Sequence, residues 1–219
     1  FGCGTPRFHE AQLGCYVEMA SMTCRCGKVK IQFTATSPRI STECCCDHCF
    51  ARVQCLAALG GPKVPTEEPL LASKWDDKVK ILQGREQLFA YKMNPTTKVM
   101  NIASSCCHTF LLGKHSVYDT HCVTTSSDFP VFSNQENMEP ASRWFSNQWK
   151  EEKLSKCRNK LVGIWVKEDD GTIIGEDGFE DVLKDHLARM GRPIGEDAEG
   201  ESFEDIVDGI GSDNIRIMS

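Results

Sequence analysis

Cysteine is the residue type in this sequence with the greatest capacity for chemistry, since thirteen of its 219 residues are cysteines. Several lie close together, at Cys24-Arg-Cys26, at Cys44-Cys45-Cys46-Asp-His-Cys49 and at Cys106-Cys107. Such spacings suit shared ligation of a metal ion, whereas disulfides usually join distant loops, and an odd total leaves one thiol unpaired. We therefore predict bound metal, preferably zinc, and a reducing compartment.

The cysteine clusters fit two kinds of zinc site. A closed structural site takes four protein ligands, and a reactive site takes three, leaving one position open. Cys44, Cys46 and Cys49 fit an open site for a substrate thiol, with Cys45 and His48 as spare ligands, proton shuttles or bystanders. Cys24 and Cys26 can share a metal if Gly27 allows a tight bend. The isolated cysteines are expected to be free thiols, and they are Cys3, Cys15, Cys55, Cys122 and Cys157.

Short alternating segments around these clusters predict a small, mainly β body. The expected strands are 29–33, 78–82 and 161–166. A long loop is expected over 124–140. Apolar residues at helical spacing predict a helix from Phe179 to Met190, ended by Gly191 and Pro193, and a second helix from Phe203 to Val207. The expected domains are an N-terminal segment (1–20), a zinc-binding β domain (21–150) and a C-terminal strand with a partly helical acidic extension (151–219).

Charge is unevenly distributed along the chain. Residues 168–208 hold fifteen acidic and three basic residues, although the whole chain has a net charge of only −6. An acidic segment of this kind repels phosphates, so we expect no nucleic-acid partner, and it is a candidate surface for protein partners. The rest of the chain is mildly basic and can attract a small anionic substrate. No apolar run is long enough to span a bilayer.

The order of the motifs resembles the glutathione-dependent formaldehyde-activating enzyme family, whose domain centromere protein V shares. The resemblance covers roughly residues 20–125. The segments that carry it are Cys24-Arg-Cys26-Gly27-Lys-Val-Lys-Ile31, Cys44-x-Cys46-x-x-Cys49, Gly84-x-x-x-Leu88-x-x-Tyr91 and Cys107-His-Thr109. The resemblance implies a β-tent of packed antiparallel sheets. It also implies one structural and one catalytic zinc, and a carbon–sulfur lyase that joins formaldehyde and glutathione into S-hydroxymethylglutathione.

The resemblance assigns the catalytic zinc to Cys44, Cys46 and Cys49, and three structural ligands to Cys24, Cys26 and Cys107. The fourth structural ligand of the family falls on Ser104, which is a poor zinc ligand. That site is therefore expected to be incomplete unless Cys106 or His108 substitutes for the serine. Arg52 is the one basic residue retained directly after the catalytic cluster, and it is a candidate partner for a glutathione carboxylate.

Three functions remain open from the sequence. The first is a zinc enzyme that acts on glutathione or a related small thiol. The second is a catalytically degenerate accessory subunit of a larger complex, docked through the acidic extension. The third is a thiol sensor that uses Cys45 and the pair Cys106-Cys107. The expected location is a reducing compartment, either the cytoplasm or, because the chain opens on Phe1, a mitochondrion or plastid.

Overall fold

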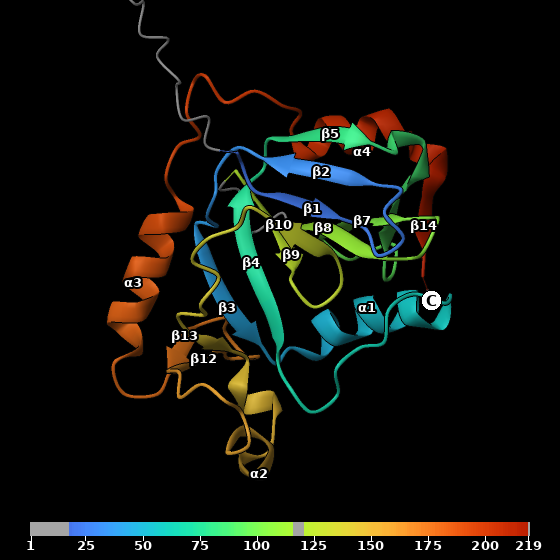
Figure 1. Ribbon diagram of the computed structural model, residues 1–219. Coiled ribbons are helices and arrows are strands. Elements are labelled where there is room, and N and C mark those ends of the chain that lie inside the picture. The colour runs from blue at the N-terminus through green and yellow to red at the C-terminus, as the bar shows by residue number, and fades with distance from the viewer. Residues whose placement is uncertain (1–17, 116–120, 219) are drawn as a thin grey trace, which may run out of the picture.

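The chain is mainly β and forms two sheets (Figure 1). The computed structural model describes residues 18–115 and 121–218. The N-terminal segment predicted over 1–20, with Cys3 and Cys15, lies almost wholly outside the described residues. No described helix has the length and apolar character needed to cross a membrane.

The smaller sheet has four strands in the order β10-β1-β2-β5, and every neighbouring pair is antiparallel. Its strands are β1 (Ser21–Thr23), β2 (Lys30–Phe33), β5 (Val79–Gln83) and β10 (Val131–Ser133). In β2, Ile31 and Phe33 are buried while Lys30 and Gln32 are partly exposed, which is the alternation that the sequence shows. Buried side chains of this sheet, such as Ile31 and Phe33, form one side of the hydrophobic core.

The larger sheet has ten strands in the order β13-β12-β11-β3-β4-β9-β8-β7-β6-β14. Its central strands are antiparallel, whereas β14 pairs parallel to β6, and β11 pairs parallel to β3 and β12. The strands are β3 (Ile40–Cys44), β4 (Leu70–Asp76), β6 (Leu88–Lys92), β7 (Val99–Ser104), β8 (Phe110–His115), β9 (Cys122–Ser126), β11 (Arg143–Trp144), β12 (Gly163–Val166), β13 (Ile173–Gly175) and β14 (Ile215–Ile217).

Helices cover both faces of the larger sheet. The four helices are α1 (Asp47–Ala58), α2 (Glu151–Leu154), α3 (Phe179–Met190) and α4 (Phe203–Ile210). Phe203 and Ile206 of α4 belong to the core between the two sheets. On the opposite face, Val53 and Leu56 of α1 pack in a second apolar cluster that includes Phe110 of β8. The larger sheet is therefore the middle layer of the molecule.

The acidic C-terminal segment is part of the sheet framework. β13 and β14 form the two edges of the larger sheet, so residues after 160 close it at both ends. Ser202 caps α4, accepting from the Asp205 backbone N–H at 3.1 Å while the Asp205 carboxylate accepts from the Ser202 N–H at 3.0 Å. Figure 1 shows α4 beside β5, and it shows α3 at the opposite side of the molecule, next to β3.

Several expectations can be compared with these elements. Strands at 30–33, 79–83 and 163–166 confirm the three predicted strands, and α3 and α4 confirm the two predicted helices. The long loop predicted over 124–140 is wrong, because β9 runs into it and β10 lies within it. The reason is pairing: β9 is buried between β4 and β8, and β10 pairs with β1. Neighbours in space, not local composition, make these segments strands.

Candidate metal centre

Four cysteines from two hairpin turns lie together, and we name them the four-cysteine cluster. They are Cys24, Cys26, Cys106 and Cys107, and their sulfur atoms all lie within 4.8 Å of one another. No other group of three or more ligand atoms is as compact within residues 18–115 and 121–218. Four cysteines at this spacing can bind a metal ion.

The β1–β2 turn positions the first pair. Cys24 follows β1, its N–H donates to the Val29 carbonyl at 2.9 Å, and the Gly27 N–H donates back to the Cys24 carbonyl at 2.9 Å. Gly27 has a φ of 81°, a left-handed value that glycine adopts without strain. The Val29 N–H also donates to Cys24 Sγ at 3.2 Å, which orients the sulfur. The tight bend expected at Gly27 is therefore present.

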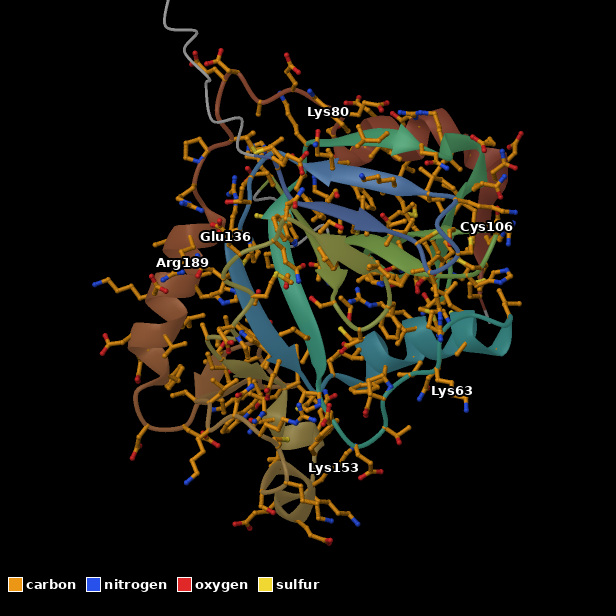
Figure 2. The ribbon with its side chains drawn as sticks, in the orientation of Figure 1. Lys63, Lys80, Cys106, Glu136, Lys153 and Arg189 are labelled. Carbon is orange, nitrogen blue, oxygen red and sulfur yellow. The ribbon has the colours of Figure 1, made fainter. Side chains whose placement is uncertain are left out.

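The β7–β8 turn positions the second pair. The Ser104 N–H donates to the Thr109 carbonyl at 3.0 Å, and the Thr109 N–H donates to Ser104 Oγ at 3.1 Å. Between them the chain bulges out, with His108 at a φ of 48°, and presents Cys106 and Cys107. The Arg25 N–H donates to Thr109 Oγ1 at 3.1 Å and so ties the two turns together. Figure 2 places Cys106 on the side of the molecule where the β1–β2 turn lies.

Sulfur–sulfur distances in the cluster suit zinc. Cys106 Sγ lies 3.3 Å from Cys26 Sγ and 3.8 Å from Cys24 Sγ, and the Cys24 and Cys26 sulfurs are 3.6 Å apart. Cys107 Sγ lies 4.0 Å from Cys106 Sγ. In a tetrahedral site with zinc–sulfur bonds of about 2.3 Å, neighbouring sulfurs are about 3.8 Å apart. The donor set and its spacing therefore fit a four-thiolate zinc site.

Cys106 takes the place that the resemblance assigned to Ser104. Ser104 is fully buried, and its Oγ lies 3.3 Å from Cys107 Sγ, where it supports the ligand instead of replacing it. His108 is not part of the cluster, and its ring lies edge-on to Phe89 at 6.3 Å. Of the two substitutes that the sequence left open, the structure shows Cys106, because the bulged turn brings the cysteine two positions after Ser104 to the other sulfurs.

Thiol acidity within the cluster is uneven. Burial raises the pKa of Cys24, and burial with hydrogen bonds to Cys26 and Cys24 raises the pKa of Cys106 to about 12. Burial also raises the pKa of Cys107, but hydrogen bonds from Ser104 and Thr109 outweigh it and leave that pKa at about 6. Cys107 is therefore the cysteine of this cluster best prepared to be a thiolate without a metal.

A second group, which we name the three-cysteine cluster, lies where β3 meets α1. Cys44 ends β3, Cys46 precedes the first residue of α1, and Cys49 lies in the first turn of that helix. The three thiols lie near enough to shift one another's pKa, although their sulfurs do not form a second group as compact as the first. The structure thus brings all three predicted residues together.

The thiols of the three-cysteine cluster differ in acidity. Hydrogen bonds from Cys44 and Cys46 hold the pKa of Cys49 well below its usual value, and the nearby charges of Arg52 and Lys74 lower it further. Hydrogen bonds with Cys46 and Cys49, together with burial, hold the pKa of Cys44 well above its usual value. Cys49 is therefore the first thiol here to ionise, in positively charged surroundings.

Cys45 and His48 do not join this cluster. Cys45 is fully buried, and its charged neighbours are Arg143 and Glu43; burial raises the pKa of Cys45 to about 12. His48 is exposed on the first turn of α1. The sulfurs of Cys55, Cys122 and Cys157 each donate to a backbone carbonyl and form no disulfide. These cysteines match the expectation for isolated thiols.

Comparison with known proteins assigns no function to either cluster. No family model matches the chain, and no curated protein matches it. The interpretation of both clusters therefore rests on their geometry and on the chemistry of their residues.

Sequence reasoning missed one cation and one amide near the three-cysteine cluster. Lys74 of β4 donates to Thr124 Oγ1 and acts electrostatically on both Arg52 and Cys49. Asn101 of β7 is fully buried beside Gly113 and Arg52. Lys74 is distant from every cysteine in the chain, and Asn101 is near only Cys106 and Cys107 of the other cluster, so the available signal was a polar residue within a strand otherwise rich in apolar residues. The sheet register, which joins β4 to β9 and β7 to β8, brings them to the cluster.

Proposed function

We propose that this chain is a two-zinc protein that resembles the glutathione-dependent formaldehyde-activating enzymes and joins a small thiol to an aldehyde. The observation that carries the proposal is the four-cysteine cluster, because Cys106 supplies the ligand that the resemblance left missing at Ser104. The three-cysteine cluster offers one ligand fewer, as an open site requires. The β-tent arrangement expected from the resemblance is part of the proposal.

The two clusters have separate roles in this proposal. The four-cysteine cluster takes a structural zinc that fastens the β1–β2 turn to the β7–β8 turn. Cys44, Cys46 and Cys49 hold the second zinc and leave one position for a ligand. A zinc ion at this position lowers the pKa of a bound thiol, so that the thiolate predominates at neutral pH.

The residues of the chain direct the reaction by charge. Arg52 and Lys74 add positive charge next to Cys49, which attracts an anionic thiol and stabilises its sulfur as the thiolate. In the reaction the substrate thiol gives up its proton and its sulfur forms a bond to the aldehyde carbon. The π bond of the carbonyl breaks, and the carbonyl oxygen takes up one proton. With formaldehyde the product is an S-hydroxymethyl adduct of the thiol; its cleavage is the carbon–sulfur lyase direction, and its formation is the reverse of that direction.

The alternative, an accessory subunit that docks partners through its acidic segment, has less support. Three acids of that segment already pair with cations of the body: Glu199 with Lys80, Glu201 with Arg85, and Glu204 with Lys114. The segment also supplies β13, one edge strand of the larger sheet, and the residues that follow it form β14, the other edge. These acids are used within the chain, so the negative charge by itself does not argue for a protein partner.

The enzymatic proposal is tested by measuring S-hydroxymethylglutathione formation with ¹³C-formaldehyde and NMR, above the uncatalysed rate. The wild-type chain should accelerate the reaction, and Cys46→Ser should return it to the background rate. Cys157→Ser is the matched control, because Cys157 is a part-buried thiol that donates to the Lys153 carbonyl, outside both clusters. A wild-type rate equal to background, in protein that carries two zinc ions, would refute the lyase activity.

A further inference from the structure

A pocket lies at the start of β3, and no cysteine of either cluster lines it. Its volume is about 590 Å³, which is within the range of small-molecule sites. Its lining comes from residues 35–41, from residues between 137 and 141, and from the end of α3 with the residues after it. Figure 2 labels Arg189 of this lining, and it labels Glu136, which accepts a hydrogen bond from Thr36 of the lining.

Arg39 is the buried cation of this pocket. Only 4% of its surface is exposed; its Nε donates to Asp76, and its Nη1 donates to the carbonyls of Met190, at 2.6 Å, and Arg192. Its Nη2 has no acceptor among the described residues and is not one of the fully enclosed nitrogen atoms, so its remaining surface faces the pocket. A guanidinium held in this way can donate through its free nitrogen to an anion.

Two arginines from the end of α3 add positive charge to the pocket. Arg189 and Arg192 both line it and are exposed. Arg189 pairs with Asp185 at 2.8 Å, but both side chains are 53% exposed, so the pair contributes little and leaves Arg189 available to a ligand. Arg192 forms no ion pair with a described acid. Glu139 is the one acid in the lining, so the pocket favours an anion although α3 belongs to the acidic segment.

The rest of the lining is polar and contains no aromatic ring. Ser37, Asn137 and Glu139 offer a hydroxyl, an amide and a carboxylate. Groups of this kind exchange hydrogen bonds with the hydroxyls of a sugar, as an acidic residue does with a ribose hydroxyl. A nucleobase would find no ring to stack on. The neutral part of the ligand is therefore expected to carry hydroxyl groups.

We propose that this pocket binds a phosphorylated sugar or a similar small phosphate that carries several hydroxyls. Arg39, Arg189 and Arg192 bind the phosphate oxygens, and Asn137 and Glu139 bind hydroxyl groups. A phosphate suits three guanidinium groups better than a carboxylate, because it carries up to two negative charges at neutral pH and three acceptor oxygens. The site does not depend on the proposed function, because neither cluster contributes a residue to it.

Isothermal titration calorimetry of the full chain tests the proposal. The probes are glucose 6-phosphate, ribose 5-phosphate, glucose, inorganic phosphate and malate. Arg192→Gln removes one positive charge from the pocket at an exposed side chain, and Arg158→Gln is the matched control, because Arg158 is exposed and does not line the pocket. Arg39 is left unchanged because it also holds the end of α3.

At least one of the two sugar phosphates should bind saturably at millimolar concentrations, and glucose should bind about tenfold or more weakly. Arg192→Gln should weaken that binding about tenfold, the usual effect of one charged hydrogen bond, with an unchanged Tm. Arg158→Gln should bind as the wild type does. If neither sugar phosphate binds, or if the two variants bind equally, the proposal is overturned.

The other probes test the class of ligand. Inorganic phosphate should bind more weakly than the sugar phosphate. Glu139→Gln should bring the two affinities closer, because it removes an acceptor for the hydroxyls and a charge that repels phosphate. Inorganic phosphate that binds the wild type as tightly as the sugar phosphate would overturn the assignment to a sugar, and tighter binding of malate would overturn the assignment to a phosphate.

Discussion

The two cysteine clusters are held by different kinds of local structure. The four-cysteine cluster joins two hairpin turns that are tied by a backbone-to-side-chain hydrogen bond, in which the Arg25 N–H donates to Thr109 Oγ1. The three-cysteine cluster joins the end of β3 to the first turn of α1, next to two cations. One arrangement offers four sulfurs that can surround an ion, and the other offers three cysteines beside positive charge. Ligand count and nearby charge, more than cysteine content, distinguish a structural from a reactive site.

Loss of one ligand from the four-cysteine cluster should have the largest effect on stability. Cys106→Ser leaves three sulfurs to hold two turns, so we expect that zinc to be lost and unfolding to become easier by about 5 kcal/mol, which is roughly 10–20 °C in Tm. Calorimetry together with zinc analysis measures both quantities. Cys157→Ser serves as the control and should change neither. A Cys106→Ser protein with normal zinc content and Tm would break the distinction between the clusters.

The corresponding change in the three-cysteine cluster should spare the fold. Cys49→Ser should remove the second zinc and abolish thiol binding, with a loss of only about 1–2 kcal/mol in unfolding free energy, because the apolar residues of α1 still pack on the sheet. The same calorimetry and zinc analysis apply. If Cys49→Ser destabilises the chain as much as Cys106→Ser, both clusters are structural and the contrast is lost.

Particular residues show what the sequence could and could not predict. Cys24 and Cys26 were predictable as a pair because their spacing is a local property, and Cys107 was named through the resemblance. Strands such as β2 were predictable because four consecutive residues show the alternation. Cys106 could be named only as an alternative, since the choice between it and Ser104 depends on the bulge of the β7–β8 turn.

Features that depend on non-local contacts could not be predicted from the sequence. β14 pairs parallel to β6 across more than a hundred residues, which turns an expected extension into a sheet edge. Arg52 resembles any surface arginine in the sequence, and only the packing of α1 against β8 shows that it is buried. The same holds for Lys74, because the register of β4 with β9 sets its position.

Acid should weaken the fold through a residue that belongs to neither cluster, and this effect must be subtracted when acid is used to compare them. His186 of α3 is 4% exposed, lies 5.2 Å from the Trp144 ring, and has a buried Nδ1 without a partner. Burial, with a smaller contribution from the charge of Lys74, lowers the pKa of His186 from 6.5 to about 4. Since the folded pKa is below the unfolded one, the unfolded chain binds the proton more readily as pH falls.

The expected cost is about 3 kcal/mol of unfolding free energy between pH 6.5 and pH 4, measured by urea unfolding at several pH values. His186→Gln should remove most of this slope, because glutamine does not titrate. An unchanged slope in that variant would assign the acid sensitivity to other groups, such as the thiolates of the clusters.

A small, local change should affect one cluster only. The Tyr91 hydroxyl donates to the Arg52 carbonyl at 3.0 Å and so links β6 to α1. Tyr91→Phe should lower the unfolding free energy by about 1 kcal/mol, the usual value of one such bond. It should also weaken zinc binding at the three-cysteine cluster modestly and leave the four-cysteine cluster unchanged. Equal loss at both clusters in a chelator titration would show that they are not independent.

The most direct test of two unequal metal sites is native mass spectrometry of the full chain, its Cys106→Ser variant and its Cys49→Ser variant, each in excess zinc followed by buffer exchange. Two zinc ions per wild-type chain and one in each variant are expected, with the ion retained by Cys49→Ser the slower to leave when chelator is added. A single zinc in the wild type that survives in Cys49→Ser would contradict a metal at the three-cysteine cluster. A wild type without zinc would contradict both sites.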